Sequence, residues 1–348
     1  MNRCPACGKT YGDEARFCTR DGSKLVAVVE KGTPRETVAG RAERPSAVTH
    51  ANLVGRVLDG RYRIERKVGE GGMSFVYLAK DIASDEQYAI KVLSAALSSD
   101  VNAMARLRRE ASLGMRLAHP NVCHIIRLGE TPDGLVYVVM PYVEGEVLSD
   151  RNNRLGTLPI ADVVNYVRDI AAGLHVAHEL KIVHRDLKPE NVMICRNPDG
   201  SERAVVMDFG LAKERRADAE LQKLTATGII LGTPEFMSPE QLRGRPLDPR
   251  TDVYSLALMT YEMLTGKLPF TGRTQQEMMI ARLRSDPVPL RDAAPSLGLA
   301  AVERVLQKAM QRDPGDRYQT APEFATALAA ASKTDGEETS RLGRFFAR

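Results

Sequence analysis

The residues best suited to chemistry lie in one stretch of eight, His184-Arg185-Asp186-Leu187-Lys188-Pro189-Glu190-Asn191. Phosphoryl transfer depends on positioning and charge neutralisation more than on covalent chemistry, and this stretch supplies groups for both. Asp186 can accept the proton of a substrate hydroxyl or orient that hydroxyl. Lys188 can neutralise charge on the transferred group, and Asn191 can hold a magnesium ion. The alternative, a merely charged loop, would not need this combination of groups.

A lysine in an apolar segment supplies another cation. Lys91 ends Tyr88-Ala89-Ile90-Lys91, which predicts a strand, although an exposed lysine at a sheet edge is an alternative. Glu110 shares a leucine-lined face of the next predicted helix, and a glutamate on an apolar face requires a cation. The sequence therefore predicts a Lys91–Glu110 pair, in which Lys91 holds the α- and β-phosphates of a nucleotide.

A second carboxylate follows a short apolar segment. Asp208 opens Asp208-Phe209-Gly210, directly after the predicted strand at Ala204–Met207. Magnesium prefers few carboxylates together with phosphate oxygens. Asp208 and Asn191 therefore predict a site for Mg²⁺, or Mn²⁺ in its place.

A glycine-rich turn, Gly69-Glu70-Gly71-Gly72-Met73-Ser74-Phe75-Val76, joins two predicted strands. Glycine lets backbone amides approach an anion closely, because no Cβ intervenes. A dinucleotide-binding loop would instead open a helix. The strand–loop–strand setting favours a lid over the phosphates of ATP, with a plain hairpin turn as the alternative.

Two groups of predicted elements must position these residues. Residues 61–140 read as strands with a single helix at Val101–Leu117, including strands at Gln87–Leu93, Cys123–Leu128 and Leu135–Met140. Beyond residue 145 the pattern is helical, with short strands at Val192–Ile194 and Ala204–Met207. The predicted helices are Ile160–Leu180, Thr251–Thr265, Gln275–Leu283, Ala300–Met310 and Ala321–Ala331. This order predicts an α+β chain with a strand-rich and a helical lobe around a cleft.

From about Arg61 to Ala331 the chain resembles the eukaryotic-like serine/threonine protein kinases of bacteria. The motifs in family order are the glycine turn, Ala89-Ile90-Lys91, His184–Asn191, Asp208-Phe209-Gly210 and Ser238-Pro239-Glu240. The resemblance implies the two-lobed kinase fold and transfer of the ATP γ-phosphate to protein serine or threonine hydroxyls. Lys188 within Asp-Leu-Lys-Pro-Glu-Asn is the serine/threonine form of the loop.

The resemblance also implies roles for single residues. Thr233 would help to bind the substrate hydroxyl, Asp252 would brace the catalytic loop, and Glu240 would pair with Arg317. The residues implied at the nucleotide are Gly69, Glu70, Gly71, Gly72, Met73, Ser74, Val76, Ala89, Lys91, Met140, Pro141 and Val143.

Met140 looks like the gatekeeper beside the adenine pocket. The family commonly has glutamate where Pro141 stands, but a proline keeps the carbonyl that adenine needs, and Val143 would supply the hinge amide.

Two other classes compete with this interpretation. Small-molecule phosphotransferases, such as those that act on aminoglycosides, share the lobes but lack the full loop motif and the peptide-binding Ser-Pro-Glu segment. A pseudokinase scaffold is expected to have lost Lys91, Asp186 or Asp208, and all three are present.

Regulation is predicted between Asp208 and Glu240. Phosphorylation of Thr225 or Thr227 would add roughly −1.5 to −2 charges, which Arg185 could bind to order the loop. The hypothesis is autophosphorylation of this activation loop, with homodimerisation during the reaction. Ordinary loop threonines are the alternative.

The N-terminus carries three clustered cysteines. Cys4 and Cys7 form one knuckle, whereas Cys18 is followed by Asp21 where a fourth cysteine would stand. This spacing predicts a zinc-ribbon-like module over residues 1–24, with a metal-free remnant as the alternative. Residues 25–58 read as a flexible linker, 59–332 as the kinase domain and 333–348 as a polar and basic tail, for which contact with a membrane surface is an alternative.

Composition limits the remaining classes. The chain has 348 residues and a net charge of +4, without a basic stripe interleaved with aromatics, which argues against nucleic acid as a partner. No run of 18 apolar residues and no apolar signal stretch occur, so a cytoplasmic location without a membrane span is expected. Cys123 and Cys195 are predicted to be buried apolar residues.

Overall fold

A computed structural model describes residues 2–3, 10–11, 26–27, 53–71, 74–94, 101–209 and 234–346. Contacts divide the chain into two units, Met1–Val48 and Thr49–Arg348. The first unit contains a small antiparallel sheet in the order β2-β1-β3, formed by Asn2–Arg3 (β1), Thr10–Tyr11 (β2) and Val26–Ala27 (β3). The predicted zinc ligands Cys4, Cys7, Cys18 and Asp21 lie outside the described residues.

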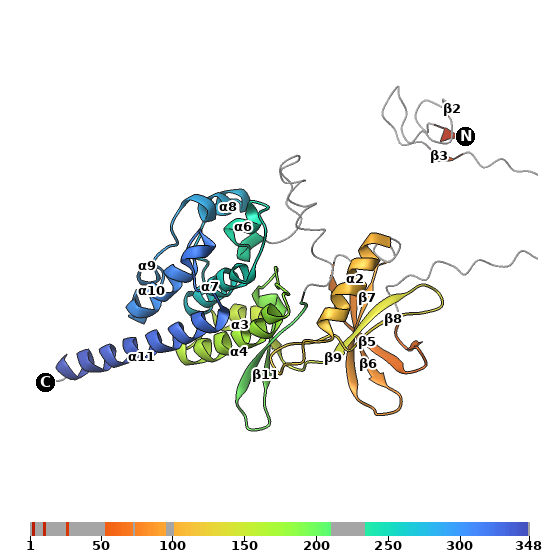
Figure 1. The fold of residues 1–348 in the computed structure, drawn as a ribbon, viewed down its shortest axis with the longest axis horizontal. Coiled ribbons are helices and arrows are strands. Elements are labelled where there is room, and N and C mark those ends of the chain that lie inside the picture. The colour runs from red at the N-terminus through yellow and green to blue at the C-terminus, as the bar shows by residue number, and fades with distance from the viewer. Residues whose placement is uncertain are drawn as a thin grey trace, which may run out of the picture. The chain divides into compact units, whose positions relative to one another are not determined.

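The second unit begins with a six-stranded antiparallel sheet in the order β4-β5-β6-β7-β9-β8 (Figure 1). Its strands are Val57–Leu58 (β4), Tyr62–Gly71 (β5), Ser74–Asp81 (β6), Gln87–Leu93 (β7), Arg127–Glu130 (β8) and Val136–Pro141 (β9). The helix α2 (Val101–Gly114) completes this lobe.

The alternation along β9 explains why this sheet needs cover on both faces. Val136, Val138 and Met140 join an apolar cluster with the buried side chains of α2, whereas Tyr137 and Val139 join a second cluster. Successive side chains of a strand point to opposite faces, so an all-apolar strand such as β9 requires two cores.

The strand-rich lobe extends further toward the N-terminus than predicted. Leu53 and Leu58 are 2% and 0% exposed and belong to the second apolar cluster, while β4 pairs with β5. The lobe therefore includes residues 53–58, which the sequence had assigned to a flexible linker.

The predicted strand at Cys123–Leu128 is wrong in its first half. The amide of Cys123 donates to the carbonyl of Val206 in the other lobe, 2.9 Å away, and ladder pairing in β8 starts only at Arg127. Residues 123–126 thus link the lobes, which an apolar pattern alone does not distinguish from a strand.

The second lobe is helical, and its other elements pack around the central helix α7 (Pro249–Thr265). Apolar and polar residues on all sides of α7 are buried, as expected for a helix at the centre of a lobe. Asp248 caps its N-terminus and Gly266, at φ +66°, ends it. The other helices are α3 (Leu148–Leu155), α4 (Ile160–Glu179), α6 (Pro239–Leu242), α8 (Gln275–Arg284), α9 (Leu290–Ala293), α10 (Ala300–Ala309) and α11 (Ala321–Phe346), with helical turns η1 (Pro189–Asn191), η2 (Pro234–Phe236), η3 (Pro295–Leu297) and η4 (Pro314–Asp316).

A three-stranded sheet, β10-β11-β12, lies at the start of this lobe. It is formed by Glu146–Val147 (β10), Val192–Arg196 (β11) and Glu202–Val206 (β12). All its strands pair antiparallel. Because β11 follows Asn191 and β12 precedes Asp208, this pairing brings the two predicted metal ligands to the same end of the sheet.

The helix predicted to end at Ala331 continues to Phe346, through the segment interpreted as a tail. Asp335, 2% exposed, gives the physical reason. Its two carboxylate oxygens accept the amides of Ala301 and Val302 at 2.9 and 3.0 Å, at the N-terminus of α10.

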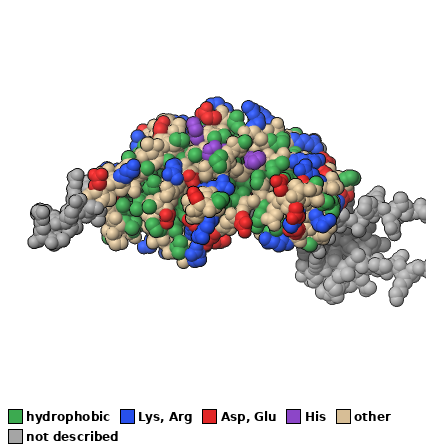
Figure 2. All heavy atoms as spheres, turned by 90° about the horizontal axis from the view of Figure 1, so that it is seen from below, with side chains coloured by type: hydrophobic (Ala, Val, Ile, Leu, Met, Phe, Trp, Pro, Cys, Tyr) green, Lys and Arg blue, Asp and Glu red, His purple; other side chains and the backbone are tan. Residues whose placement is uncertain are grey.

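Among the described helices, none is both long and apolar enough to cross a bilayer. The face shown in Figure 2 carries basic and acidic side chains side by side, without a continuous patch of one sign.

Candidate active site

The polar residues of the His184–Asn191 loop converge on Asp186. The Asn191 side-chain amide donates to the Asp186 carbonyl at 2.7 Å and to its carboxylate Oδ2 at 2.9 Å. The Lys188 ammonium lies 3.7 Å from the same Oδ2. The turn η1 makes this possible, because it reverses the chain between Lys188 and the strand β11.

A buried carboxylate on α7 holds the backbone of this loop. Asp252, 0% exposed, accepts the amides of His184 and Arg185 at 2.8 and 3.0 Å. The His178 ring, from α4, lies 2.7 Å from the same carboxylate. Burial alone would raise the pKa of Asp252, but the hydrogen bond and charge of His178 and the partners at His184 hold this pKa below its ordinary value.

Asp208 is fixed by the strand before it. The Met207 amide donates to the Asn191 carbonyl at 2.8 Å, and the His184 ring lies 2.9 Å from the Met207 carbonyl. Asp208 itself has φ +56°, which is unusual for a residue with a Cβ. Phe209 is buried edge-on against His184, with ring centroids 4.8 Å apart.

Lys91 reaches Asp208 from the other lobe. Its ammonium lies 2.8 Å from Asp208 Oδ1, and its side chain is only 13% exposed. Lys91 pairs with Val76 on one side and Val138 on the other, so it occupies an interior strand. The alternative of an exposed edge lysine is therefore wrong. Glu110 lies on α2, but its side chain is outside the described part of the structure, and the predicted Lys91–Glu110 pair stays a prediction.

Residues predicted to surround adenine share one apolar cluster. Ala89 and Met140 are paired across β7 and β9, and Val76 and Val143 pack against the same cluster. The sequence did not single out Met193, which packs there from β11 in the helical lobe. Its place two residues after Asn191, on a strand, was the only available signal.

The structure describes Pro141 and the strands beside the glycine turn, and their predicted contacts with a nucleotide stay predictions. The Pro141 carbonyl has the Cys123 thiol 3.7 Å away. Burial raises the pKa of that thiol to about 12, so Cys123 is a small apolar residue as expected. The strands β5 and β6 pair as far as Gly71 and Ser74, whereas Gly72 and Met73 lie outside the described residues.

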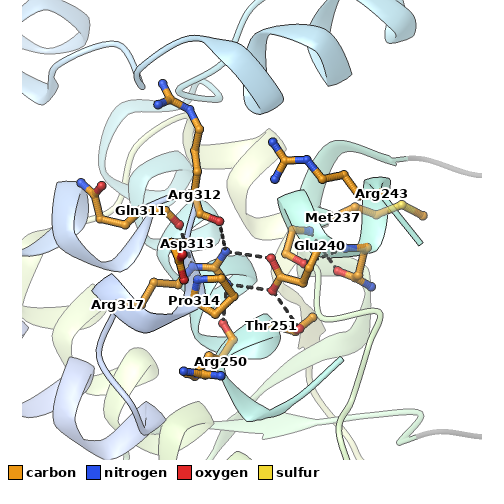
Figure 3. A network of polar contacts seen from close by, with 12 residues as sticks. Met237, Glu240, Arg243, Arg250, Thr251, Gln311, Arg312, Asp313, Pro314 and Arg317 are labelled. Carbon is orange, nitrogen blue, oxygen red and sulfur yellow. Dashed lines mark hydrogen bonds and ion pairs between the residues drawn. The ribbon is translucent and has the colours of Figure 1, made fainter. Parts of the chain in front are cut away.

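A network of buried charges holds the Ser238-Pro239-Glu240 segment (Figure 3). Glu240 and Arg317, 5% and 2% exposed, form a two-pronged ion pair with both N–O distances at 2.8 Å. Thr251 also donates to Glu240, at 2.9 Å. The guanidinium additionally donates to the carbonyls of Arg250, Gln311 and Arg312. The predicted Glu240–Arg317 pair is confirmed.

The Arg317 guanidinium also stabilises the charge of Glu240. Burial would raise the pKa of Glu240, but the hydrogen bonds and charge of Arg317 dominate and lower it. The carboxylate therefore stays ionised inside the lobe, and each of its two oxygens accepts a hydrogen bond from the guanidinium.

A second buried arginine was not predicted. Arg282 on α8 is 1% exposed and donates to the carbonyls of Pro234, Met237 and Glu235 at 2.6, 2.9 and 2.5 Å. Burial lowers the pKa of its guanidinium. No sequence pattern on α8 distinguishes this arginine from its exposed neighbour Arg284, because its partners are backbone atoms of a distant turn.

Besides the zinc ligands and Gly72 and Met73 named above, three further predicted site residues lie outside the described part of the chain. They are Thr233, Thr225 and Thr227, and they fall with Gly210 in residues 210–233. Arg185 is described, at φ +65°, and its backbone contacts Asp252 as given above.

A strand-rich lobe, a helical lobe and a lysine–aspartate contact between them define the two-lobed kinase fold. Residues 62–327 match the family model of the protein kinase domain, and the chain belongs to that family.

It is 36% identical over 281 residues to serine/threonine-protein kinase pkn3 of Myxococcus xanthus, covering 80% of this chain and 51% of that protein. With pkn2 of the same organism the identity is 40% over 292 residues, covering 82% and 34%. The kinase domain of Mycobacterium tuberculosis PknI superposes with a TM-score of 0.62 at 28% identity, covering 80% of this chain and 100% of that domain. The chain thus spans about half or less of the curated relatives it matches.

Replacing Arg317 by methionine should destabilise the helical lobe severely. The change leaves the Glu240 carboxylate buried without its cation, which costs about 3–5 kcal/mol in the free energy of unfolding. Arg312→Met is the matched control, because its ion pair with Asp286 is exposed and contributes at most about 1 kcal/mol. Urea unfolding at neutral pH measures both, and equal losses would contradict the assignment.

The same pair predicts an acid dependence. Because the pKa of Glu240 is lower in the folded than in the unfolded state, its contribution is present above the unfolded pKa and is lost as pH falls through the folded one. The stability difference between the parent and Glu240→Gln should therefore narrow on acidification. A difference that stays constant with pH would contradict the role of this carboxylate.

Proposed function

We propose that this chain transfers the γ-phosphate of ATP to serine and threonine hydroxyls of proteins. The observation that carries the proposal is that Lys91 contacts Asp208 while Asn191 contacts Asp186, and that Asn191 and Asp208 lie at the same end of the β10-β11-β12 sheet. These four residues come from three separate places in the chain. Its kinase relatives support the same activity, although the chain spans only part of their length.

The polar groups suit a magnesium-bound nucleotide. The amide nitrogen of Asn191 is engaged by Asp186, which leaves the amide oxygen as the atom able to bind a metal. Asp208 supplies the carboxylate, and the Lys91 ammonium would hold the α- and β-phosphates. Magnesium, or manganese, would neutralise phosphate charge there. Val76, Ala89, Met140, Val143 and Met193 form an apolar surface for adenine.

Asp186 and Lys188 would act on the transferred group. Asp186 accepts the proton of the substrate hydroxyl, or orients that hydroxyl, and Lys188 neutralises charge on the phosphoryl group. The Asn191 amide holds the Asp186 carboxylate in place for this. We assign Thr233 to the binding of the same hydroxyl on the basis of the family resemblance.

The protein substrate class rests on the segment after Thr233. The ion pair of Glu240 with Arg317 and the three carbonyl contacts of Arg282 hold residues 234–240 rigidly. A small-molecule phosphotransferase would not need this segment. Lys91, Asp186 and Asp208 are all present, which favours a kinase over a pseudokinase scaffold.

Asp186→Asn should lower the rate of phosphate transfer to a generic protein substrate by about 10²–10⁴-fold, the range for loss of a general base. The asparagine keeps one oxygen for the Asn191 amide, so the fold should survive. Asp162→Asn, the same change at an exposed position of α4, is the control. Labelled ATP measures transfer, and full activity in Asp186→Asn would remove the residue from its role.

We propose further that the activation loop is autophosphorylated at Thr225 or Thr227, with transient homodimerisation. Arg185, next to Asp186, is the proposed partner of the phosphate. Mass spectrometry should find loop phosphate in the active protein and none in Asp186→Asn. An active protein without loop phosphate would defeat the idea. A cytoplasmic location remains a prediction from the sequence.

We also propose that Cys4, Cys7, Cys18 and Asp21 bind one zinc ion, since thiolates and carboxylates are both zinc ligands. Elemental analysis of freshly purified protein should give close to one equivalent of zinc, and Cys7→Ser should lose it. Well under one equivalent in the parent would favour the metal-free alternative.

A further inference from the structure

The peptide backbone just before Asp186 is in a conformation that its surroundings must enforce. Arg185 has φ +65°, in the left-handed region that residues with a Cβ seldom adopt. The position of the Asp186 carboxylate therefore depends on whatever holds the peptide groups of Arg185.

One side of this restraint is already described. Asp252 on α7 accepts the Arg185 amide at 3.0 Å and the His184 amide at 2.8 Å. This contact fixes the N–H group of Arg185 from beneath the loop but leaves its carbonyl group to another partner.

That partner is Gln241. Its side-chain nitrogen donates to the Arg185 carbonyl at 2.6 Å, across 56 residues of sequence. Gln241 is 7% exposed, so this hydrogen bond is shielded from water. It belongs to α6, the helix that also carries Glu240.

The orientation of the Gln241 amide is set by its other end. The side-chain oxygen of Gln241 accepts the backbone N–H of Ser238 at 2.9 Å, and the Ser238 hydroxyl accepts the backbone N–H of Gln241 at 3.3 Å. These two hydrogen bonds form a capping box at the start of α6. A flipped amide would place NH₂ against an N–H group at Ser238 and an oxygen against a carbonyl at Arg185. Only the observed orientation satisfies both partners.

We propose that Gln241 is a positioning residue that couples the 234–242 segment to Asp186, an inference that rests on the proposed kinase function. Adjacent side chains of α6 have different partners: Glu240 anchors the segment to Arg317, and Gln241 transmits its placement to the loop. Arg282 holds the preceding turn η2 from α8. These contacts hold the proposed peptide-binding segment in a fixed position relative to the loop that would act on the hydroxyl of the bound peptide.

Two substitutions separate the hydrogen bond from Gln241 to the Arg185 carbonyl, called the bridge below, from the capping box with Ser238. Gln241→Glu keeps an oxygen for the Ser238 amide, because glutamate also serves in a capping box, but an ionised carboxylate cannot donate to the Arg185 carbonyl. Gln241→Met loses both contacts at similar length. Gln311→Glu is the matched control, since it removes a side-chain amide bond to a backbone carbonyl, that of Gln307, on the surface.

Steady-state kinetics with a peptide substrate at mildly alkaline pH, on proteins matched in phosphorylation state, tests the proposal. Gln241→Glu and Gln241→Met should both lower kcat by on the order of 10- to 100-fold, as small misplacements of reacting groups do. The KM for magnesium-ATP should stay unchanged, because Lys91 and Asp208 are untouched. Gln311→Glu should behave as the parent.

Hydrogen exchange adds a measurement that does not need activity. Peptides covering residues 184–191 should exchange faster in Gln241→Glu and in Gln241→Met than in the parent. Because Gln241→Glu buries a carboxylate without a cation and is expected to lower the melting temperature, exchange is measured well below the melting temperature of each protein. A Gln241→Glu variant with parental kcat and exchange would show that only the cap matters and would overturn the proposal. A parent without transfer activity would refute the kinase function, whereas the exchange result would still decide the bridge.

Discussion

The contact between the Lys91 ammonium and the Asp208 carboxylate joins groups that are 117 residues apart in the chain and 2.8 Å apart in space. Lys91 reaches it from an interior strand, and Asp208 from the end of β12. The Lys91 side chain is only 13% exposed, and an ammonium group is costly to bury without a partner, so Asp208 has to be held firmly beside it. The two lobes therefore have to meet at this point, and the nucleotide site follows from their meeting.

Two residues with left-handed backbone show how firmly the site is held. Arg185 and Asp208, at φ +65° and +56°, each store roughly 1–3 kcal/mol of strain. The Arg185 amide donates to Asp252, and the Arg185 carbonyl accepts from Gln241. Asp208 follows Met207, whose amide donates to the Asn191 carbonyl. The helical lobe thus acts as a rigid support, in which buried polar contacts specify one arrangement of a few reactive groups.

The sequence alone was sufficient to predict contacts between segments that follow one another closely in the chain. The loop from His184 to Asn191 and the aspartate after β12 were predicted correctly as neighbours, because order and spacing alone bring them to one end of a small sheet. The Glu240–Arg317 pair came from family resemblance. The sequence failed where tertiary contacts decide: residues 123–126 link the lobes, Asp335 extends the last helix, and Met193, Gln241 and Arg282 act through partners that no periodic pattern reveals.

The central claim is that Lys91 and Asp208 hold a magnesium nucleotide between them. Calorimetric titration of the purified chain with a non-hydrolysable ATP analogue and magnesium tests it most directly, beside a Lys91→Ala, Asp208→Ala double variant whose fold is checked by circular dichroism. The parent should bind the magnesium nucleotide, and the folded double variant should lose that binding. Undiminished binding by the double variant, or none by the parent, would contradict the account.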